Sequence, residues 1–574
     1  MNIKNFLKKK IKKSFKINKI SKKNKPIIKK NLKKTKLGEY QVNNIMKIAS
    51  KKKKNSYKLA IKIAKKINLI GISKIIISKP GFINISLSKN WLEKKILLQI
   101  KSKRNNIPKL YSEKVIIDYS SPNISKEMHV GHLRSTILGD ATAKIMKFLG
   151  YKVIKINHIG DWGLNFGIII SYLIKFKINI KKISLKNLNK YYVLAKKKYK
   201  KSKKFKKISQ NYSIKLQNEK KKYIKLWKKI VKITINENQK LYQKLKINLN
   251  KKNIIGESKY RKMLPKITKE LTKKKIAIKK KGCIIIFLNE FKNKKGKKMG
   301  VIIKKKNGLF LYTTIDIACI KYRFKKLKAN RIIYYTDSRQ KQHLKQVWII
   351  SKKAGYIPKK TKLEHHSFGM MLKKNKKPFK TRSGNIITLK SLIKKSILKA
   401  KKIILKKNPN IKKNKLKSLS EKIGIGAIKY SDLSKNRKTD YIFNWNNILS
   451  FQGNTALYIQ YSYTRIISIL KKNTIKKKIK QGNFKISNKI ELKLSIKLLQ
   501  FEEILIKTTK KGYSNILCNY LYELSVNFSY FYEKYSILFS NIKKKKNRLK
   551  LIFLIKKTLK LGLKILGISV IKKM

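Results

Sequence analysis

The sequence contains little negative charge, few cysteines and no long apolar run. It holds only 23 Asp and Glu against 152 Lys and Arg, which gives a formal net charge of +129. Its three cysteines, Cys283, Cys319 and Cys518, lie far apart and form no CxxC pair, so we expect neither a disulfide framework nor a structural zinc site. No apolar run approaches the roughly 18 residues of a membrane span. These absences indicate a cytoplasmic protein in a reducing compartment, with no membrane segment.

The large positive charge has two explanations, which the scarcity of arginine helps to separate. A polyanion partner such as RNA is one of them. The other is mutational drift, because Lys, Ile and Asn dominate and their codons consist mainly of A and T. Only ten residues are arginine, although arginine grips phosphate in a bidentate way. We therefore attribute most of the lysine excess to drift and expect the arginines and the few acids to be more informative.

Helix and strand patterns divide the chain into three predicted domains. Hydrophobic residues make up 42% of the sequence, which is enough for globular cores. Residues 1–108 mix helical periodicity with short strands, including a hairpin turned at residues 79–81, and predict a small α+β domain. Residues 109–395 alternate strands and helices, which predicts an α/β, Rossmann-type parallel sheet with an insertion at about 175–305. Strand signals fade in residues 396–574, which predict an all-α bundle.

The main candidate ligand site lies between Asp118 and Asp140. A short apolar strand precedes Asp118, a Ser-Ser-Pro-Asn turn follows it, and the motif His129-Val130-Gly131-His132 then opens a helix. Open α/β sheets bind ligands just beyond the carboxyl ends of their strands, and a helix N-terminus attracts phosphate. Two imidazoles three residues apart can donate to the same anion, and Gly131 lets a flat group lie close to the backbone. The pattern therefore predicts a phosphate-binding site.

A simpler interpretation is a capped helix whose two histidines are partly exposed. The distribution of histidine argues against it, because both ends of the chain lack this residue. The six histidines of the chain are His129, His132, His158, His343, His365 and His366. Such clustering favours a site over scatter.

Further polar motifs follow later strands of the predicted sheet. The stretch Leu309–Tyr312 is predicted as a strand that leads into a helix carrying Asp316. Residues 337–343 come directly after another predicted strand and are well placed for ligand contact. Residues 377–384 form a cationic loop that ends in glycine, which suits a mobile clamp on phosphate.

In this order, the motifs resemble those of bacterial class I arginyl-tRNA synthetases over nearly the whole chain. The segment from Pro122 to His132 is similar to the HIGH signature region. The segment Phe379–Gly384 lies where other class I enzymes carry KMSKS, and its departure from KMSKS is typical of this family. Four stretches carry the resemblance most closely: residues 118–167, 308–348, 364–384 and 432–465.

The resemblance implies a ligase that activates L-arginine with ATP and then passes the arginyl group to the 3′ end of arginine tRNA. Activation needs no protein nucleophile, so catalysis is expected to rest on electrostatic positioning, with Mg²⁺ bound to the substrate rather than to a dedicated protein site. The implied catalytic residues are His129, His132, Lys126, Lys380 and Arg382. The implied ATP-binding residues are Pro122, His129, Gly131, His132, Met370 and Met371.

The resemblance also implies where arginine and tRNA bind. A guanidinium is best recognised by planar carboxylates, and Asp118 and Asp316 both stand at the ligand edge of the sheet. The simpler alternatives are structural: Asp118 would cap a turn, and Asp316 would be a negative charge near the start of a helix. The implied arginine-binding residues are Asp118, Asn123, Tyr312, Asp316 and Gln340. The implied tRNA-binding residues are Tyr458, Gln460 and Arg465, although tyrosines of a bundle are more often core.

On this basis, residues 1–108 are expected to contact tRNA and residues 396–574 to bind the anticodon, in a protein that acts as a monomer. Leu457 departs from the family pattern, which has proline before the tyrosine of a GNTAPY-like segment. Two rivals stay open at this point. One is a class I enzyme for another amino acid, which the pair of Asp118 and Asp316 disfavours. The other is a basic RNA-binding protein with a decayed synthetase domain, which the intact histidine and FKTRSG motifs disfavour.

Overall fold

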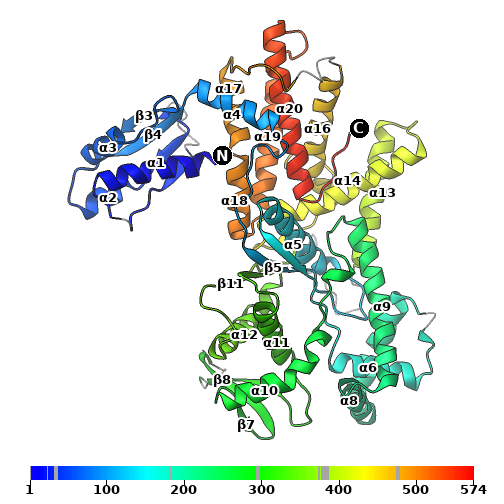
Figure 1. Cartoon of the computed structure of the whole chain (residues 1–574). Helices are drawn as coiled ribbons and strands as arrows, with labels where there is room; N and C mark the ends of the chain where they lie inside the picture. Colours follow the sequence, from blue (N-terminus) through cyan, green and yellow to red (C-terminus); the bar gives the residue numbers. More distant parts are fainter. Residues whose placement is uncertain are drawn as a thin grey trace.

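The computed structural model shows an elongated molecule with a parallel sheet near its middle (Figure 1). A helical bundle lies on one side of the sheet, and the insertion lies on the other. The N-terminal domain projects sideways from the bundle as an arm. The structure describes residues 2–21, 23–30, 37–180, 183–292, 296, 298–372, 375–376, 387–472 and 479–573.

The central sheet has the strand order β11-β10-β5-β6, and its strands are all parallel. Its strands are β5 (Lys114–Asp118), β6 (Lys152–Ile156), β10 (Arg331–Tyr334) and β11 (Lys362–His365). Apolar and β-branched residues fill β5 and β10, as expected for strands covered on both faces. Asp118 pairs with Tyr334 and with Ile156, so the three strands end at one edge. The predicted α/β Rossmann-type fold is confirmed.

Helix α5 (Val130–Phe148) connects β5 to β6 and forms the hub of the molecule. Most of its residues are buried, because it packs against the sheet on one side and against α13, α14, α18 and α20 on the other. Helices α11 (Tyr312–Lys325) and α12 (Lys341–Lys353) lie on the opposite side of the sheet from α5 (Figure 1). The N-terminus of α5 therefore opens at the sheet edge between the two halves of the molecule.

The N-terminal domain is built on an antiparallel sheet of order β1-β2-β4-β3. The predicted hairpin is confirmed, since β3 (Ser73–Ser78) pairs antiparallel with β4 (Phe82–Leu87). Its other elements are α1 (Ile3–Ile17), β1 (Ile28–Lys30), β2 (Tyr40–Val42), α2 (Ile45–Lys51), α3 (Ser56–Lys65) and α4 (Lys89–Lys101). Glu503 of the bundle accepts hydrogen bonds from the Lys4 N–H (2.8 Å) and the Tyr40 hydroxyl (3.1 Å), which fixes the arm to the bundle.

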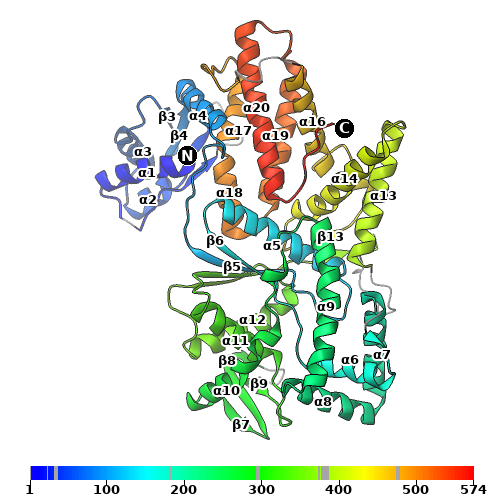
Figure 2. The ribbon, with the colours of Figure 1, turned by 45° about the vertical axis from the view of Figure 1, so that its right-hand side comes forward.

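The insertion consists of helices followed by a small antiparallel sheet (Figure 2). It contains α7 (Leu185–Lys201), α8 (Lys203–Gln217), α9 (Lys221–Lys244), α10 (Leu264–Lys273), β7 (Ile278–Lys280), β8 (Cys283–Lys292) and β9 (Lys298–Lys304), after α6 (Leu164–Lys175). The prediction of a strand at Leu309–Tyr312 is wrong. Phe310 forms only an isolated bridge with Lys304, and α11 begins at Tyr312, because residues 307–308 turn the chain directly into the helix.

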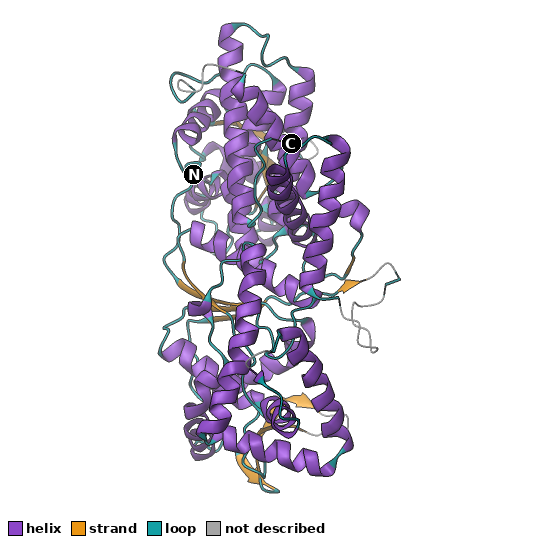
Figure 3. Cartoon of the chain, turned by 90° about the vertical axis from the view of Figure 1, so that its right-hand side faces the viewer, coloured by secondary structure: helices purple, strands orange, loops and turns teal. Residues whose placement is uncertain are grey.

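Helices dominate the remainder of the chain, as predicted (Figure 3). They are α13 (Leu389–Lys407), α14 (Lys413–Leu433), α15 (Trp445–Ile448), α16 (Ala456–Lys471), α17 (Lys489–Leu499), α18 (Phe501–Lys511), α19 (Asn515–Lys534) and α20 (Ile542–Ile565). Two short strands, β12 (Met371–Leu372) and β13 (Tyr441–Ile442), pair in parallel. The apolar stripe predicted in the last helix is fully buried in the bundle: Ile552, Ile555, Leu559, Leu563 and Leu566.

Candidate active site

A cavity of about 330 Å³ opens where β5, β10 and β11 end and α5 begins. One wall comes from the turn after β5 and the first turn of α5. A second wall follows β10, and the third comes from the loop after β11. The lining residues are Ser120, Ser121, Asn123, His129–His132, Arg134, Ser135, Tyr335–Asp337, Arg339, Gln340 and Phe368–Met371. The cavity therefore lies where an open α/β sheet is expected to bind its ligand.

His129 and His132 cap the N-terminus of α5 and fix each other's orientation. Nδ1 of His129 accepts a hydrogen bond from the Gly131 N–H (3.1 Å), and Nδ1 of His132 accepts one from the His129 N–H (3.2 Å). The ring centroids lie 4.1 Å apart. Because each Nδ1 accepts, each neutral ring carries its proton on Nε2 and can act there as a donor. The capping interpretation and the site interpretation are thus compatible, since the cap sets the tautomer.

Gly131 is required by the histidine that precedes it. A Cβ at this position would lie 2.9 Å from Cε1 and 3.0 Å from Nδ1 of His129, which is too close for the capped ring. The glycine therefore preserves the orientation of His129 and leaves the backbone of the first helical turn uncovered at the cavity.

Asp118 is buried and already paired with a cation of the chain. Nη2 of Arg323 lies 2.5 Å from its Oδ2, and the Ser121 hydroxyl donates to its Oδ1 at 2.9 Å. Arg323, on α11, is fully buried, so the two charges hold each other in the interior, and neither residue is among the described residues that line the cavity. Asp118 is thus a structural anchor as well as a predicted ligand.

Asp316 has a more accessible environment on the same helix. Its Oδ2 lies 2.6 Å from Nε2 of His343 on α12, and its side chain keeps 31% of its surface exposed. Tyr312, one turn earlier and 61% exposed, packs edge-to-face on His343 with the centroids 4.8 Å apart. Tyr312, Asp316 and His343 therefore form one group, in which Tyr312 is exposed and the other two are partly buried. The cavity-lining residue Gln340 immediately precedes α12, the helix that carries His343.

The remaining predicted residues of the ATP, arginine and catalytic sets divide into three groups. Met370 and Met371 line the cavity, as do Asn123 and Gln340. Pro122 is buried beneath the turn and is not among the lining residues that the structure describes. Lys380 and Arg382 lie outside the described residues.

Lys126 contacts the insertion rather than the cavity. Its ammonium lies 5.1 Å from the ring centroid of Tyr192 on α7, a cation–π distance. Tyr192 is itself buried and donates to Oδ1 of Asn165 (3.2 Å). The position of Lys126 is thus tied to the first helix of the insertion.

The predicted tRNA-binding residues on α16 have unequal exposure. Tyr458 is partly exposed, and the Arg465 guanidinium lies 4.2 Å from the ring of Tyr532. Gln460 is fully buried, and its amide donates to the Ser569 carbonyl (2.7 Å). Gln460 is therefore a packing residue and not an RNA contact, because it holds the C-terminal tail inside the bundle.

The sequence interpretation missed three titratable or charged residues next to the site. Arg323 stands seven positions after Asp316 on the same helix face. The rarity of arginine in this chain was the signal that could have pointed to it. His343 was noted among the clustered histidines and within residues 337–343 but was given no role. Burial raises the pKa of Glu257 to about 7, with nearby Asp316 and Asp161 adding to the effect. Glu257 carried no sequence signal, since it lies in the insertion.

Comparisons with known families assign all three parts of the chain. Residues 93–445 match the family described as "tRNA synthetases class I (R), catalytic domain". Residues 459–574 match the "DALR anticodon binding domain", and residues 1–87 match the "Arginyl tRNA synthetase N terminal domain". The catalytic match continues through α13 and α14, past the boundary at residue 395 that the sequence predicts.

Individual proteins agree with these families. The chain is 54% identical to "Arginine--tRNA ligase" of Wigglesworthia glossinidia brevipalpis, with 100% of both chains covered. It is also 54% identical to the protein of that name from Buchnera aphidicola subsp. Schizaphis graminum, covering 94% of this chain and 95% of that one. The structure of the Plasmodium falciparum arginyl-tRNA synthetase has a TM-score of 0.86 at 32% identity, covering 100% and 99% of the two chains. The Thermus thermophilus arginyl-tRNA synthetase shares the fold, with a TM-score of 0.81 at 20% identity and coverage of 99% and 100%.

A parallel sheet with a histidine-capped helix at its ligand edge, followed by a helical anticodon-binding domain, defines a class I aminoacyl-tRNA synthetase. The family matches and the full-length identity then specify the amino acid. The chain belongs to the arginyl-tRNA synthetases, which use ATP to join arginine to its tRNA.

Proposed function

We propose that the cavity at the N-terminus of α5 binds ATP and that arginine binds beside it, in contact with Tyr312, Asp316 and Gln340. The carboxylate of arginine would then face the α-phosphate, with pyrophosphate as the leaving group. The observation that carries this proposal is the paired cap of His129 and His132, which presents two Nε2–H donors at a helix N-terminus.

His129 and His132 act on the phosphates as the negative charge grows in the transition state. Their donors are fixed before the substrate arrives, so little reorganisation accompanies the reaction. Gly131 leaves room for the nucleotide, and Met370 and Met371 supply an apolar wall for the adenine ring. Met371, earlier in the chain than Lys380 and Arg382, lines the cavity, and Thr388, later in the chain, forms an isolated β-bridge with His129. Lys380 and Arg382 are proposed to neutralise the polyphosphate, and Lys126, which contacts Tyr192 in this structure, is proposed to add its charge from the side of the insertion.

Asp316 is proposed to be the main partner of the substrate guanidinium. Its carboxylate is accessible, whereas Asp118 already holds Arg323 and Ser121. A carboxylate oxygen can accept more than one hydrogen bond, so Asp118 is proposed to contribute a second contact in addition to those with Arg323 and Ser121. Asn123 and Gln340, both at the cavity wall, are proposed to bind the polar end of arginine.

Mg²⁺ is proposed to enter with the ATP phosphates. The part of the chain that the structure describes holds no cluster of three or more His, Cys, Asp or Glu side chains arranged for a metal ion. The acids nearest the cavity are also engaged, since Arg339 pairs with both carboxylate oxygens of Asp337 at 2.7 Å. The ion would supply charge neutralisation of the phosphates.

The tRNA is proposed to contact the N-terminal arm and the bundle while its 3′ end enters the cavity. Tyr458 and Arg465 are the proposed contacts on α16, and the protein is proposed to act as a cytoplasmic monomer. Among the described helices, none is both long and apolar enough to cross a membrane.

An aminoacylation assay with L-arginine, ATP, Mg²⁺ and arginine tRNA tests the proposal. We expect arginylation, and we expect ATP–pyrophosphate exchange to require the tRNA. Changing His129 or His132 to Ala should lower the exchange rate by roughly 10²–10³, as for the loss of one preorganised donor. Robust exchange without RNA, or His→Ala variants that lose activity only in step with thermal stability, would contradict these roles.

A further inference from the structure

The corner between α18 and α19 lies directly against the loop that walls the ATP cavity. Helix α18 ends at Gly512, whose φ is +63°. A Cβ at Gly512 would lie 2.2 Å from Nδ1 of His366 and 2.9 Å from the Tyr335 hydroxyl. His366 is only two residues before Phe368, the first wall residue contributed by this loop. The anticodon-binding domain thus meets the base of the wall-forming loop at Gly512.

His366 is a rigid spacer, because both of its ring nitrogens are engaged. Nε2 donates to Oε2 of Glu364 (2.9 Å), which Arg331 also holds, and Nδ1 lies 3.1 Å from the Tyr335 hydroxyl. The Tyr335 hydroxyl in turn lies 2.6 Å from the Thr142 hydroxyl on α5. The ring therefore has one orientation, and a shift of the corner must be passed on to the loop.

Arg437 makes a second link between the corner and the wall. Only 4% of its surface is exposed, and its partners are carbonyl oxygens from two separate segments. Nε donates to the Gly512 carbonyl (3.1 Å), Nη2 donates to the Lys511 carbonyl (3.2 Å), and Nη1 donates to the Ser367 carbonyl. One guanidinium thus ties the end of α18 to the residue before Phe368.

The wall itself is hydrogen-bonded to the segment that begins with Arg437. The Gly369 N–H donates to the Arg437 carbonyl (2.8 Å), and the Met370 N–H donates to Oδ1 of Asp440 (2.6 Å). The Tyr441 N–H donates back to the Met370 carbonyl (3.1 Å). A displacement of the α18–α19 corner is consequently transmitted to Arg437 and, through the hydrogen bonds of Arg437 and its neighbours, to the wall.

We infer that the α18–α19 corner is a positioning element for the nucleotide. Through His366 and Arg437 this corner fixes the position of the cavity wall formed by Phe368–Met371. A displacement of the helical domain therefore changes the affinity of the cavity for ATP. This inference rests on the proposed function, since it takes the cavity as the ATP site. Because packed interfaces adopt discrete arrangements rather than deforming continuously, a small shift at the corner is enough to misplace the wall.

Substitution of Gly512 by Ala tests the inference with a matched control. The new Cβ meets His366, whereas Gly71 has a similar φ of +69° and nothing within 4 Å of its ideal Cβ. Both substitutions place alanine at a similar positive φ, but only Gly512→Ala adds a Cβ that meets His366 at the base of the wall. We expect the KM for ATP of Gly512→Ala, measured by arginylation of saturating tRNA, to rise by about tenfold, the factor that corresponds to roughly 1.4 kcal/mol. The KM for arginine should stay at the parent value, and Gly71→Ala should leave both constants unchanged.

Arg437 provides a second, independent pair of variants. Arg437→Lys keeps the charge but cannot span three carbonyls, so its KM for ATP should lie between those of the parent and Arg437→Met. A KM for ATP that never changes separately from the KM for arginine, or that only follows thermal stability in all three variants, would overturn the inference. The variant His129→Ala distinguishes failure of the inference from failure of the proposed function: if it leaves the rate of arginine activation unchanged, the proposed function fails. If it acts as proposed while the corner variants do not, only the positioning role fails.

Discussion

Asp118 and Asp316 have different roles although both are carboxylates at the same sheet edge. Asp118 faces a fully buried guanidinium, so its replacement leaves an uncompensated charge. Breaking such a buried pair typically costs about 3–5 kcal/mol of stability, which would obscure any effect on binding. Asp316 instead lies against His343 with part of its surface open. The accessible carboxylate is thus the one whose substitution reports on arginine itself.

Replacing Asp316 by Asn should raise the KM for arginine at least about tenfold, because a charge-assisted hydrogen bond contributes roughly 1.5–3 kcal/mol. The KM for ATP should barely change. Glu270→Gln is the control. Glu270, on α10, pairs at 2.6 Å with Lys321 of α11, the helix that carries Asp316, but Glu270 lies outside the site. If the KM for arginine of Asp316→Asn equals that of the control, the guanidinium binds elsewhere.

At the scale of elements, the sequence predicted the sheet, the histidine-bearing helix and the terminal helix because each depends on a local pattern. Strands β5 and β10 are short apolar runs, and α20 carries a regular apolar stripe. The ion pair of Arg323 with Asp118 and the close approach of Gly512 to His366 join residues far apart in the chain, so neither has a local sequence pattern. Gln460 shows the same limit, since its polarity suggested a surface while packing of the C-terminal tail buried it.

The C-terminal tail is also held by Lys429 of α14, which is fully buried. Its ammonium donates to the carbonyls of Leu245 and Gly567, each at 2.8 Å. Burial lowers the pKa of Lys429 to about 7, and Lys144 and Lys246 act in the same direction while Asp140 opposes them. The folded chain therefore gives up this proton more readily than the unfolded chain does.

The free energy of unfolding should consequently rise as the pH is raised from about 7 towards 10.5. Lys429 should contribute up to roughly 1.4 kcal/mol per pH unit to this rise. Lys429→Met removes the titration, so its melting temperature should gain less with pH than that of the parent. Lys417→Met, an exposed change on the same helix, serves as the control. Parallel curves for all three proteins between pH 7 and 9.5 would show that Lys429 does not titrate there.

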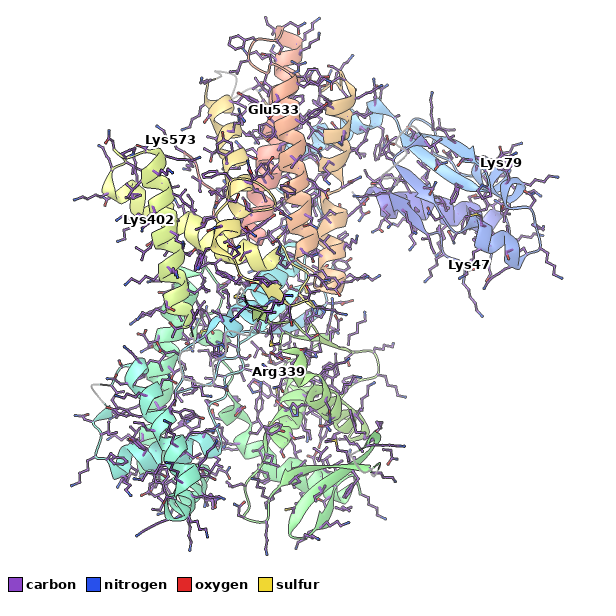
Figure 4. The ribbon with its side chains drawn as sticks, turned by 180° about the vertical axis from the view of Figure 1, so that it is seen from behind. Lys47, Lys79, Arg339, Lys402, Glu533 and Lys573 are labelled. Atoms are coloured by element: carbon purple, nitrogen blue, oxygen red, sulfur yellow. The ribbon has the colours of Figure 1, made fainter. Side chains whose placement is uncertain are left out.

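The whole molecule is open, and lysines cover all of its parts. Its accessible surface is 31991 Å², against about 21,000 Å² for a compact monomer of this size. In Figure 4, Lys47 and Lys79 lie on the N-terminal arm, while Lys402 and Lys573 lie on the far side of the bundle. Because the charge is not confined to one face, it fits compositional drift, and any tRNA is attracted to the surface.

Binding of cognate and non-cognate tRNA should therefore differ in its response to salt. Each phosphate neutralised adds about one unit to the slope of log affinity against log salt, so the nonspecific layer weakens first. The proposed specific contacts at Tyr458 and Arg465, with the N-terminal arm, involve fewer ion pairs and should persist. Discrimination should thus widen between about 50 and 200 mM salt, measured as the binding of both tRNAs to the full chain. Selectivity that is already complete at low salt, or two curves that fall in parallel, would mean that the lysine excess is not a nonspecific layer.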